Sequence, residues 1–389
     1  MANTFINVAK REFGKIFKKP VLLVIMFVVP LVICFILGET FKEGSPKNLP
    51  IAVLDQDNSS LSRKIARMVD ATPTCEVKYH VTSLEEGRQL IVGGQTYALL
   101  VIPRDFTRDI YRGTYPKLVY YYNNQLLLIG GIITKDVTMA VQTVMVGVNA
   151  KIQMKKGLPK DVALSRINLI RVDEHVRSNP YLNYSYFLSL AAFVHTFQIL
   201  IAFLAIWAVG IEFKEGTTKE WMETAGGSIL TGIFGKLTPY ILNFMIVSGL
   251  VYLIYFLGYG APFKGSIIFL AFGTLLFILA YQLIGIMFVA ITSNLRLSFS
   301  CGAFYTSLGF TFAGMTYPAI AMPAFAKFYS ALLPLRPYIS LLIDQSLREI
   351  PPVFDMVYIR WLILLALFGA AFLPLLKKHA QDEKQWYKI

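Results

Sequence analysis

The sequence PVLLVIMFVVPLVICFILG fills residues 20–38 and contains no Asp, Glu, Lys or Arg. A membrane-spanning helix needs about 20 apolar residues, because the hydrocarbon core of a bilayer is about 30 Å thick. Four more uncharged stretches are long enough, at residues 178–211, 237–263, 265–295 and 297–326. A shorter stretch at 361–376 is extended past Arg360 by residues 356–359. The sequence therefore predicts an α-helical polytopic membrane protein with six spans.

The composition agrees with this prediction. Hydrophobic residues make up 55% of the chain and charged residues 16%, and the mean hydropathy is +0.55. Soluble domains are about one quarter charged. The formal net charge of +13 is divided between segments on both sides of the predicted spans, so no single face suggests a nucleic-acid partner. The three cysteines, at positions 34, 75 and 301, are too widely spaced for a disulfide framework or a metal motif.

Basic flanks set the expected orientation of the spans. The first apolar stretch follows basic residues like a signal peptide, but it is long for that role and no Ala-x-Ala cleavage site follows it. We therefore interpret it as an uncleaved anchor. Basic residues mark cytoplasmic ends, and they occur at Lys10, Arg11, Lys15, Lys18 and Lys19 and in the C-terminal tail at Lys377, Lys378, Lys384 and Lys388. We expect both termini in the cytoplasm.

Hydropathy divides the chain into seven expected regions. These are an interfacial elbow helix at 1–19, the first span at 20–40, an extracytoplasmic domain at 41–184, the second span at 185–211, a cytoplasmic loop at 212–236, spans three to six at 237–376 with an outer re-entrant segment at about 314–350, and a cytoplasmic tail at 377–389.

The elbow helix is expected to be amphipathic. Phe13 lies on an apolar face with Phe5 and Phe17, whereas Arg11 lies on a basic face with Lys15. Such a helix lies in the membrane interface with its basic face toward anionic lipid. The alternative is a charged flank that only orients the first span.

The inserted segment 41–184 reads as a small α/β domain. Apolar strands are expected at 51–55, 77–81, 97–102 and 118–122, with helices between them, which predicts a mostly parallel sheet. A long helix at 127–156 carries an apolar stripe that we interpret as a core-facing surface, with a packing face for another protein as the alternative. The domain has no Walker A, Gly-x-Gly-x-x-Gly or Gly-x-Ser-x-Gly motif, so we expect no enzyme active site. We interpret Asp173, Glu174 and His175 as surface residues rather than metal ligands.

The loop after the second span contains an unexpected acidic segment. Residues 212–223 read EFKEGTTKEWME, and the spacing of Thr217 and Glu220 predicts a capping box at the start of a short helix. Acidic residues run against the positive-inside tendency. Docking onto a cytosolic protein would explain them, and a solvated loop is the alternative.

The sequence closely resembles the ABC-2 type permeases of ATP-binding-cassette exporters. The resemblance is to the subgroup with a large extracytoplasmic domain after the first span, which includes bacterial drug-export permeases. It extends over essentially the whole chain, and its specificity comes from the order and spacing of loose motifs. These are KREF at 10–13, KP at 19–20, Pro30, IAVLDQDNSSLS at 51–62, ALLVIP at 98–103, NP at 179–180, the acidic loop with Gly216 and Thr217, GMTYP at 314–318, MP at 322–323 and LP at 333–334. Pro337 after Arg336 departs from the family's usual pattern.

The resemblance implies a transport subunit without its own ATPase site. ATP and Mg would be bound by two copies of a separate cytoplasmic ABC ATPase, and a second permease, identical or homologous, would complete the pathway. The family's coupling loop corresponds to Glu212, Glu215, Gly216, Thr217 and Glu220, and its outer re-entrant segment or gate corresponds to Gly314, Tyr317, Pro318, Pro323 and Pro334. The resemblance also implies a location in a bacterial inner membrane and a hydrophobic or amphipathic cargo. The apolar and aromatic surface of the spans fits such a cargo, with lipid contact as the alternative.

Other assignments remain open from the sequence. His195, Gln198 and Asn243 are weak candidates for substrate contacts, with hydrogen bonds between helices as the alternative. A periplasmic adaptor and an outer-membrane channel are possible partners of the outward domain. The alternatives to an exporter are an ion-coupled secondary transporter and a surface receptor or adhesion protein. A secondary transporter would need buried carboxylates or an inverted repeat.

Overall fold

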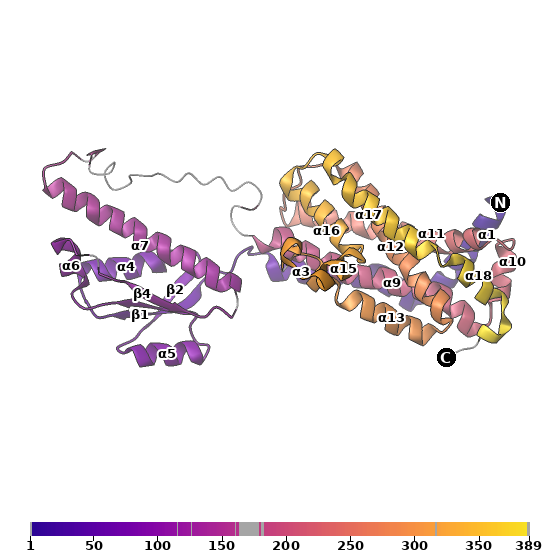
Figure 1. Cartoon of the computed structure of the whole chain (residues 1–389), viewed down its shortest axis with the longest axis horizontal. Coiled ribbons are helices and arrows are strands. Elements are labelled where there is room, and N and C mark those ends of the chain that lie inside the picture. The colour runs from indigo at the N-terminus through magenta and orange to yellow at the C-terminus, as the bar shows by residue number, and fades with distance from the viewer. Residues whose placement is uncertain are drawn as a thin grey trace. The chain divides into compact units, whose positions relative to one another are not determined.

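The computed structural model describes residues 2–114, 116–125, 127–159, 161–162, 179, 183–315 and 317–386. The chain divides into two compact units, of which one comprises Met1–Gly44 and Val176–Ile389 and the other comprises Ser45–His175. The first is a helical bundle and the second contains the only sheet among the described residues (Figure 1). The predicted polytopic helical fold with an inserted α/β domain is confirmed.

The helical unit begins with α1 (Ala2–Lys18), and its first apolar helix then runs through α2 (Pro20–Leu23), η1 (Val24–Val28) and α3 (Val29–Phe41). The chain re-enters this unit at η2 (Ser185–Ser189) and α9 (Leu190–Glu215). The following elements are α10 (Thr218–Thr224), α11 (Ile229–Leu253), η3 (Ile254–Gly258), α12 (Ile267–Thr292), α13 (Leu295–Ser307), α14 (Gly309–Phe312), η4 (Ala319–Ala321), α15 (Ala324–Ala331), α16 (Leu335–Ile343), η5 (Asp344–Arg348), α17 (Pro352–Ala370), α18 (Leu373–Gln381) and η6 (Glu383–Gln385).

Six described helices are long and apolar enough to cross a membrane. They are Pro20–Phe41, Leu128–Lys155, Ser185–Glu215, Ile229–Gly258, Ile267–Thr292 and Pro352–Gln381. Five of them coincide with predicted spans. The sixth, Leu128–Lys155, belongs to the α/β unit, where its apolar stripe packs on the sheet. The predicted stretch 297–326 is instead divided among α13, α14 and α15, because the chain turns at Leu308 and again at Gly314.

Close helix contacts hold the bundle together around α12. This helix is largely buried and packs against α9, α11, α13 and α17. A Cβ atom on Gly285 would lie 2.7 Å from the carbonyl oxygen of Ala202 in α9, and one on Gly369 would lie 2.7 Å from the carbonyl carbon of Leu283. Small residues allow such approaches, which supply van der Waals packing between membrane helices.

The α/β unit contains β1 (Leu49–Asp55), β2 (Cys75–His80), β3 (Ala98–Ile102) and β4 (Val119–Tyr122), in the order β2-β1-β3-β4. β1 pairs in parallel with β2 and β3, whereas β4 is antiparallel to β3. The prediction of a mostly parallel sheet is therefore confirmed. The strands β1 and β3 end together, because Asp55 pairs with Ile102.

Helices cover both faces of this sheet (Figure 1). On one face, α4 (Ser60–Asp70) and α7 (Leu127–Lys155) pack in a core that includes Ile65, Ile133 and Val137. On the other, α5 (Leu84–Val92) packs on a smaller core around Leu54 and Leu99. Another helix, α6 (Phe106–Arg112), ends at a left-handed Gly113. Ser59 and Ser83 cap α4 and α5, as polar side chains do when they accept the free amides of a first helical turn.

Candidate functional site: a buried ion cluster beneath an exposed acidic helix

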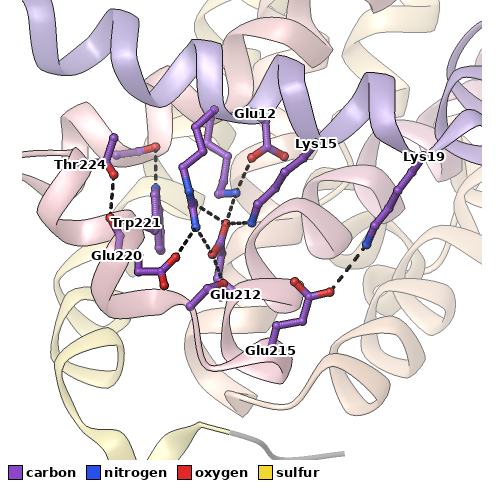
Figure 2. Close-up of polar contacts among 12 residues, drawn as sticks. Glu12, Lys15, Lys19, Glu212, Glu215, Glu220, Trp221 and Thr224 are labelled. Carbon is purple, nitrogen blue, oxygen red and sulfur yellow. Dashed lines mark hydrogen bonds and ion pairs between the residues drawn. The ribbon is translucent and has the colours of Figure 1, made fainter.

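The last turn of α9 carries a carboxylate that no water reaches. Glu212 has a side chain with 0% exposure. Its oxygens accept hydrogen bonds from Arg11 Nη1 at 2.8 Å, Arg11 Nη2 at 3.0 Å and Lys15 Nζ at 2.6 Å, all on α1. Figure 2 shows the Lys15 side chain turned toward Glu212. A residue of the predicted coupling loop thus ties that loop to the elbow helix.

A second carboxylate and a third cation complete the arrangement. Lys236, on α11, is also fully buried, and its Nζ donates to Glu212 Oε1 at 2.7 Å and to Glu12 Oε2 at 2.5 Å. The Tyr240 hydroxyl donates to Glu12 Oε1 at 2.8 Å. We call Arg11, Glu12, Lys15, Glu212 and Lys236 the ion cluster. It joins α1, α9 and α11, which are far apart in sequence.

The cluster is stable only as a unit. Removing one partner of a buried ion pair leaves an uncompensated charge and costs about 3–5 kcal/mol. Three cations and two carboxylates share the site, so each carboxylate offsets repulsion among the cations. Burial and the nearby Lys236 ammonium lower the pKa of Lys15, whereas the Glu212 carboxylate opposes that shift. Loss of Glu212 would therefore affect all three cations.

The chain turns sharply after the cluster and enters α10. Gly216 ends α9 with a φ of 69°, in the left-handed region that glycine adopts without strain. The Thr217 hydroxyl donates to Glu212 Oε2. Because that hydroxyl is engaged there, it makes no cap contact with α10, and the predicted capping box of Thr217 with Glu220 is wrong.

One face of α10 is anchored in the protein. Trp221 is fully buried, and its Nε1 donates to the Gly232 carbonyl at 3.3 Å. The Lys236 ammonium lies 5.6 Å from the centre of the Trp221 ring, within the range of a cation–π contact. Thr218 and Met222 are buried on the same side. The helix is therefore fixed to the cluster and cannot behave as a solvated loop.

The other face of α10 exposes Glu220 and Glu223 together with Lys219, and Glu215 before the turn is also exposed, so this surface is acidic on balance. The Glu220 side chain is 73% exposed, and its Oε2 lies 3.8 Å from Arg11. The Glu215 side chain is 44% exposed and lies 3.6 Å from Lys19 Nζ (Figure 2). The predicted coupling residues thus fall into two groups, with Glu212 and Thr217 holding the loop and Glu215 and Glu220 facing outward.

The basic face of the elbow helix has a different environment from the one predicted. The Arg11 and Lys15 side chains are only 20% and 24% exposed, because they bind the buried Glu212 carboxylate instead of facing lipid. Phe13 and Phe17 lie together on the other face, as predicted, and are 37% and 67% exposed. The exposed surface of α1 therefore includes these aromatic rings.

The sequence alone assigns no role of their own to Glu12, Lys236 and Tyr240. Lys236 flanks an apolar run, and a lysine whose only role is to set the membrane topology would occupy the same place in the sequence. Glu12 is the one acidic residue in an otherwise basic segment 10–19, and that exception is the signal that could have indicated a buried partner. Pairing across more than two hundred residues is visible only in the structure.

The three weak candidates for substrate contacts, His195, Gln198 and Asn243, form hydrogen bonds within and between helices. His195 Nδ1 lies 2.9 Å from Gln198 Nε2, one turn along α9, and the imidazole packs against Phe310. Gln198 also donates to the Thr306 carbonyl of α13 at 3.3 Å. Asn243 donates to the Met26 carbonyl at 2.8 Å and so joins α11 to η1. His195 still lines a cavity of about 310 Å³ with Phe310 and apolar residues of α3.

The predicted re-entrant segment consists of short helices joined at its prolines. Gly314 has a φ of 87° where the chain turns after α14, and Tyr317 is 51% exposed. Pro318, Pro323 and Pro334 occupy the caps of η4, α15 and α16. Pro337 lies in the first turn of α16, where its missing amide leaves no helical hydrogen bond unmade. The segment Asp173 to His175 and Pro180 lie outside the described residues.

Comparison with known proteins agrees with this architecture. A family model described as "ABC-2 family transporter protein" matches residues 20–376. The chain belongs to the ABC-2 transporter family. The match spans both the helical unit and the inserted α/β unit, so the resemblance drawn from the sequence motifs is confirmed.

Several curated relatives in this family are permeases. The chain is 24% identical to the probable multidrug ABC transporter permease YbhS of Escherichia coli over 361 residues, covering 91% of each chain. It is 26% identical over 340 residues to the inner membrane transport permease YhhJ of the same species, covering 86% of this chain and 85% of the relative. A stretch of 115 residues, 30% of the chain, is 28% identical to the linearmycin resistance permease protein LnrN of Bacillus subtilis. This ABC-2 family member is therefore a multi-pass membrane transport protein.

Proposed function

We propose that this ABC-2 permease is the membrane subunit of an ATP-driven exporter of hydrophobic or amphipathic compounds. The observation that carries the proposal is the exposed acidic surface of α10, which the ion cluster holds against α1, α9 and α11. A helix fixed at the end of two long apolar helices can transmit a push from a soluble partner directly into the bundle. Glu215 and Glu220 are the residues we assign to that contact.

The proposed partner is an ABC ATPase that binds ATP and Mg on a separate chain, because the 389 residues contain no phosphate-binding loop. Members of the family work with such subunits and pair as dimers. We expect two ATPase copies, a second permease, and both termini on the cytoplasmic side of the inner membrane. ATP-driven closure of the ATPase pair would favour one of two conformations of the permease pair. A periplasmic adaptor and outer-membrane channel remain a separate hypothesis without structural support.

A groove in the helical unit supports the proposed cargo class. Residues of α11, η3 and α12 line a cavity of about 440 Å³, and most of its wall is apolar. Tyr252 and Thr274 also line the cavity, and their hydroxyls are bonded to the Tyr338 hydroxyl, which lies 2.8 Å from Thr274 Oγ1. Pockets with apolar walls and a few placed polar groups suit drug-sized amphipathic molecules. We assign the apolar part of the cargo to this groove.

The proposal is tested in proteoliposomes that contain the permease with its ATPase. The wild-type complex should accumulate a fluorescent amphipathic dye when ATP is supplied and should not do so with a non-hydrolysable analogue. The double variant Glu215→Lys with Glu220→Lys should lose most of this transport while its folded yield is unchanged. Glu383→Lys, which changes an exposed acidic residue in η6, is the matched control. Transport that continues at the wild-type rate without ATP would refute the proposal.

One observation favours an ion-coupled transporter as a second candidate. Asp355, in α17, is 1% exposed, and its Oδ2 accepts a hydrogen bond from Gln345 Nε2 at 2.7 Å. Buried carboxylates in membrane proteins often carry protons. A protonophore added to the same proteoliposomes separates the two functions. It should leave ATP-driven transport intact, whereas collapse of transport with ATP still present would favour the ion-coupled function.

A further inference from the structure

The carboxyl edge of the parallel strands in the α/β unit forms an open crevice of about 680 Å³. Its floor is the end of β1, from Val53 to Gln56, and one wall is the end of β2 at His80. The Gln56 amide donates to the Ile102 carbonyl at 3.0 Å, which brings the end of β3 and the following residue Arg104 to the same edge. In open α/β sheets, ligands bind outside the carboxyl ends of the strands.

Three arginines face this crevice. Arg63 and Arg67 lie one helical turn apart on α4, and Arg104 follows β3. Arg63 Nη1 donates to the Asn58 carbonyl at 2.8 Å. Among the residues that the structure describes, the guanidinium groups of Arg67 and Arg104 have no hydrogen-bond or ion-pair partner.

The carboxylate within the crevice does not neutralise the arginines. Asp55 Oδ1 accepts the amides of Asp57 and Asn58 at 3.0 and 2.9 Å, and Oδ2 accepts the Ser62 hydroxyl at 2.7 Å. These bonds close the turn between β1 and α4 and engage both carboxylate oxygens. The crevice therefore presents an excess of positive charge with donors free to bind a ligand.

We propose that the crevice binds a phosphate group carrying two negative charges, on a small molecule or on a phospholipid headgroup. The guanidinium fork matches phosphate oxygens in pairs of hydrogen bonds. Arg67 and Arg104 make the main contacts, and Arg63 adds charge from the same helix face. The volume exceeds that of a bare phosphate and lies in the range of small-molecule pockets, so the group is a substituent of a larger ligand. This inference is independent of ATP coupling and stands if the proposed function fails.

The test uses the purified full chain in phosphatidylcholine nanodiscs and isothermal titration calorimetry. Two probes separate the sources of the phosphate. Inorganic pyrophosphate represents a soluble ligand, and dihexanoyl phosphatidic acid represents a lipid headgroup. We expect saturable binding of at least one probe. The variant Arg67→Gln with Arg104→Gln should bind at least about tenfold more weakly, because it loses the charge-assisted hydrogen bonds to the phosphate.

A matched control variant distinguishes binding in the crevice from general electrostatic attraction to the α/β unit. Arg88→Gln with Arg112→Gln changes the charge of the same unit equally, at exposed positions on α5 and α6 that do not line the crevice. This control should bind as the wild type does. Binding that is absent for both probes in the wild type, or that weakens equally in the two double variants, would overturn the proposal. Binding of pyrophosphate alone assigns a soluble ligand, and binding of phosphatidic acid alone assigns a headgroup.

Discussion

The ion cluster and the arginine crevice use the same residue types in opposite ways. In the cluster, Glu212 and Lys236 are fully buried and every charged group has a partner of opposite sign. In the crevice, Arg67 and Arg104 are exposed, and neither has a partner among the described residues. Buried charges must be paired to be tolerated, so they fix segments together. Exposed unpaired charges cost little and remain available to a ligand. The ion cluster thus holds helices together, whereas the crevice is available to bind a ligand.

The largest effect should come from Glu212→Gln. This change leaves Arg11, Lys15 and Lys236 without their shared carboxylate, and we expect a loss of about 3–5 kcal/mol of stability. Thermal unfolding and the yield of monodisperse protein measure it. Glu383→Gln, at an exposed position in η6, should stay within about 0.5 kcal/mol of wild type. Equal stability of the two variants would show that the cluster does not hold the fold.

The second effect tests whether the cluster acts as one unit. Lys236→Met and Glu12→Gln should each destabilise the protein. The first leaves the buried Glu12 carboxylate without its cation, and the second removes one of the two carboxylates that compensate the buried Lys236 ammonium. The double variant should be more stable than the sum of the two losses predicts, with a coupling of about 0.5–3 kcal/mol. A double-mutant cycle by chemical denaturation measures this coupling, and strict additivity would contradict the account.

The third effect should be close to zero and concerns the crevice. Arg67→Gln with Arg104→Gln removes two exposed charges that stabilise nothing in the described structure. The free energy of unfolding should change by no more than about 0.5 kcal/mol. A loss as large as that of Glu212→Gln would show that these arginines are structural, and the contrast between the two regions would disappear.

A further effect is confined to the loop beside the crevice and depends on pH. Burial by itself would raise the pKa of Asp57, but hydrogen bonds from Ser59 and Thr107 outweigh it and lower the pKa. A carboxyl group whose pKa is lowered by folding stabilises the fold above its ordinary value of about 3.9. That stabilisation is lost as the pH falls through the lowered value. Asp57→Asn should therefore weaken the loop at pH 7 by about 1 kcal/mol.

Hydrogen exchange of peptides that cover the β1–α4 loop measures the Asp57 effect. The difference in protection between Asp57→Asn and wild type should shrink as the pH falls through the lowered pKa of Asp57, because the protonated carboxyl group is uncharged like the amide. A difference that stays the same from pH 7 to a pH at which wild-type Asp57 is protonated would show that the carboxylate charge has no role in this loop.

Apolar runs and strand patterns were sufficient to predict most of the fold. The run from residue 20 became one continuous apolar helix, and the apolar segments around Ile51 and Leu99 became paired strands. The stretch 297–326 was harder, because its hydropathy is that of a span while Gly314 and two prolines divide it into short helices. Helix α7 shows the converse, since its apolar stripe is satisfied by a sheet.

The ion cluster and α10 could be predicted only in part from the sequence, and the reason is physical. Loop chemistry identified Glu212, Glu215 and Glu220 together, because all three are acidic residues near the end of one span. Their different burial depends on the cations of α1 and α11, whose pairing is a tertiary contact. No local pattern distinguishes a lysine that sets topology from one that is buried between two carboxylates, as Lys236 is.

The central claim is that the ion cluster holds α10 where its exposed face contacts the ATPase. Photo-crosslinking in the assembled complex tests this most directly, with a photoreactive residue at position 220, where the Glu220 side chain is 73% exposed. Position 85 on α5 of the α/β unit, where the Glu85 side chain is 63% exposed, serves as the control. The account predicts an adduct with the ATPase from position 220 and none from position 85. No adduct from position 220 in an active complex would contradict it.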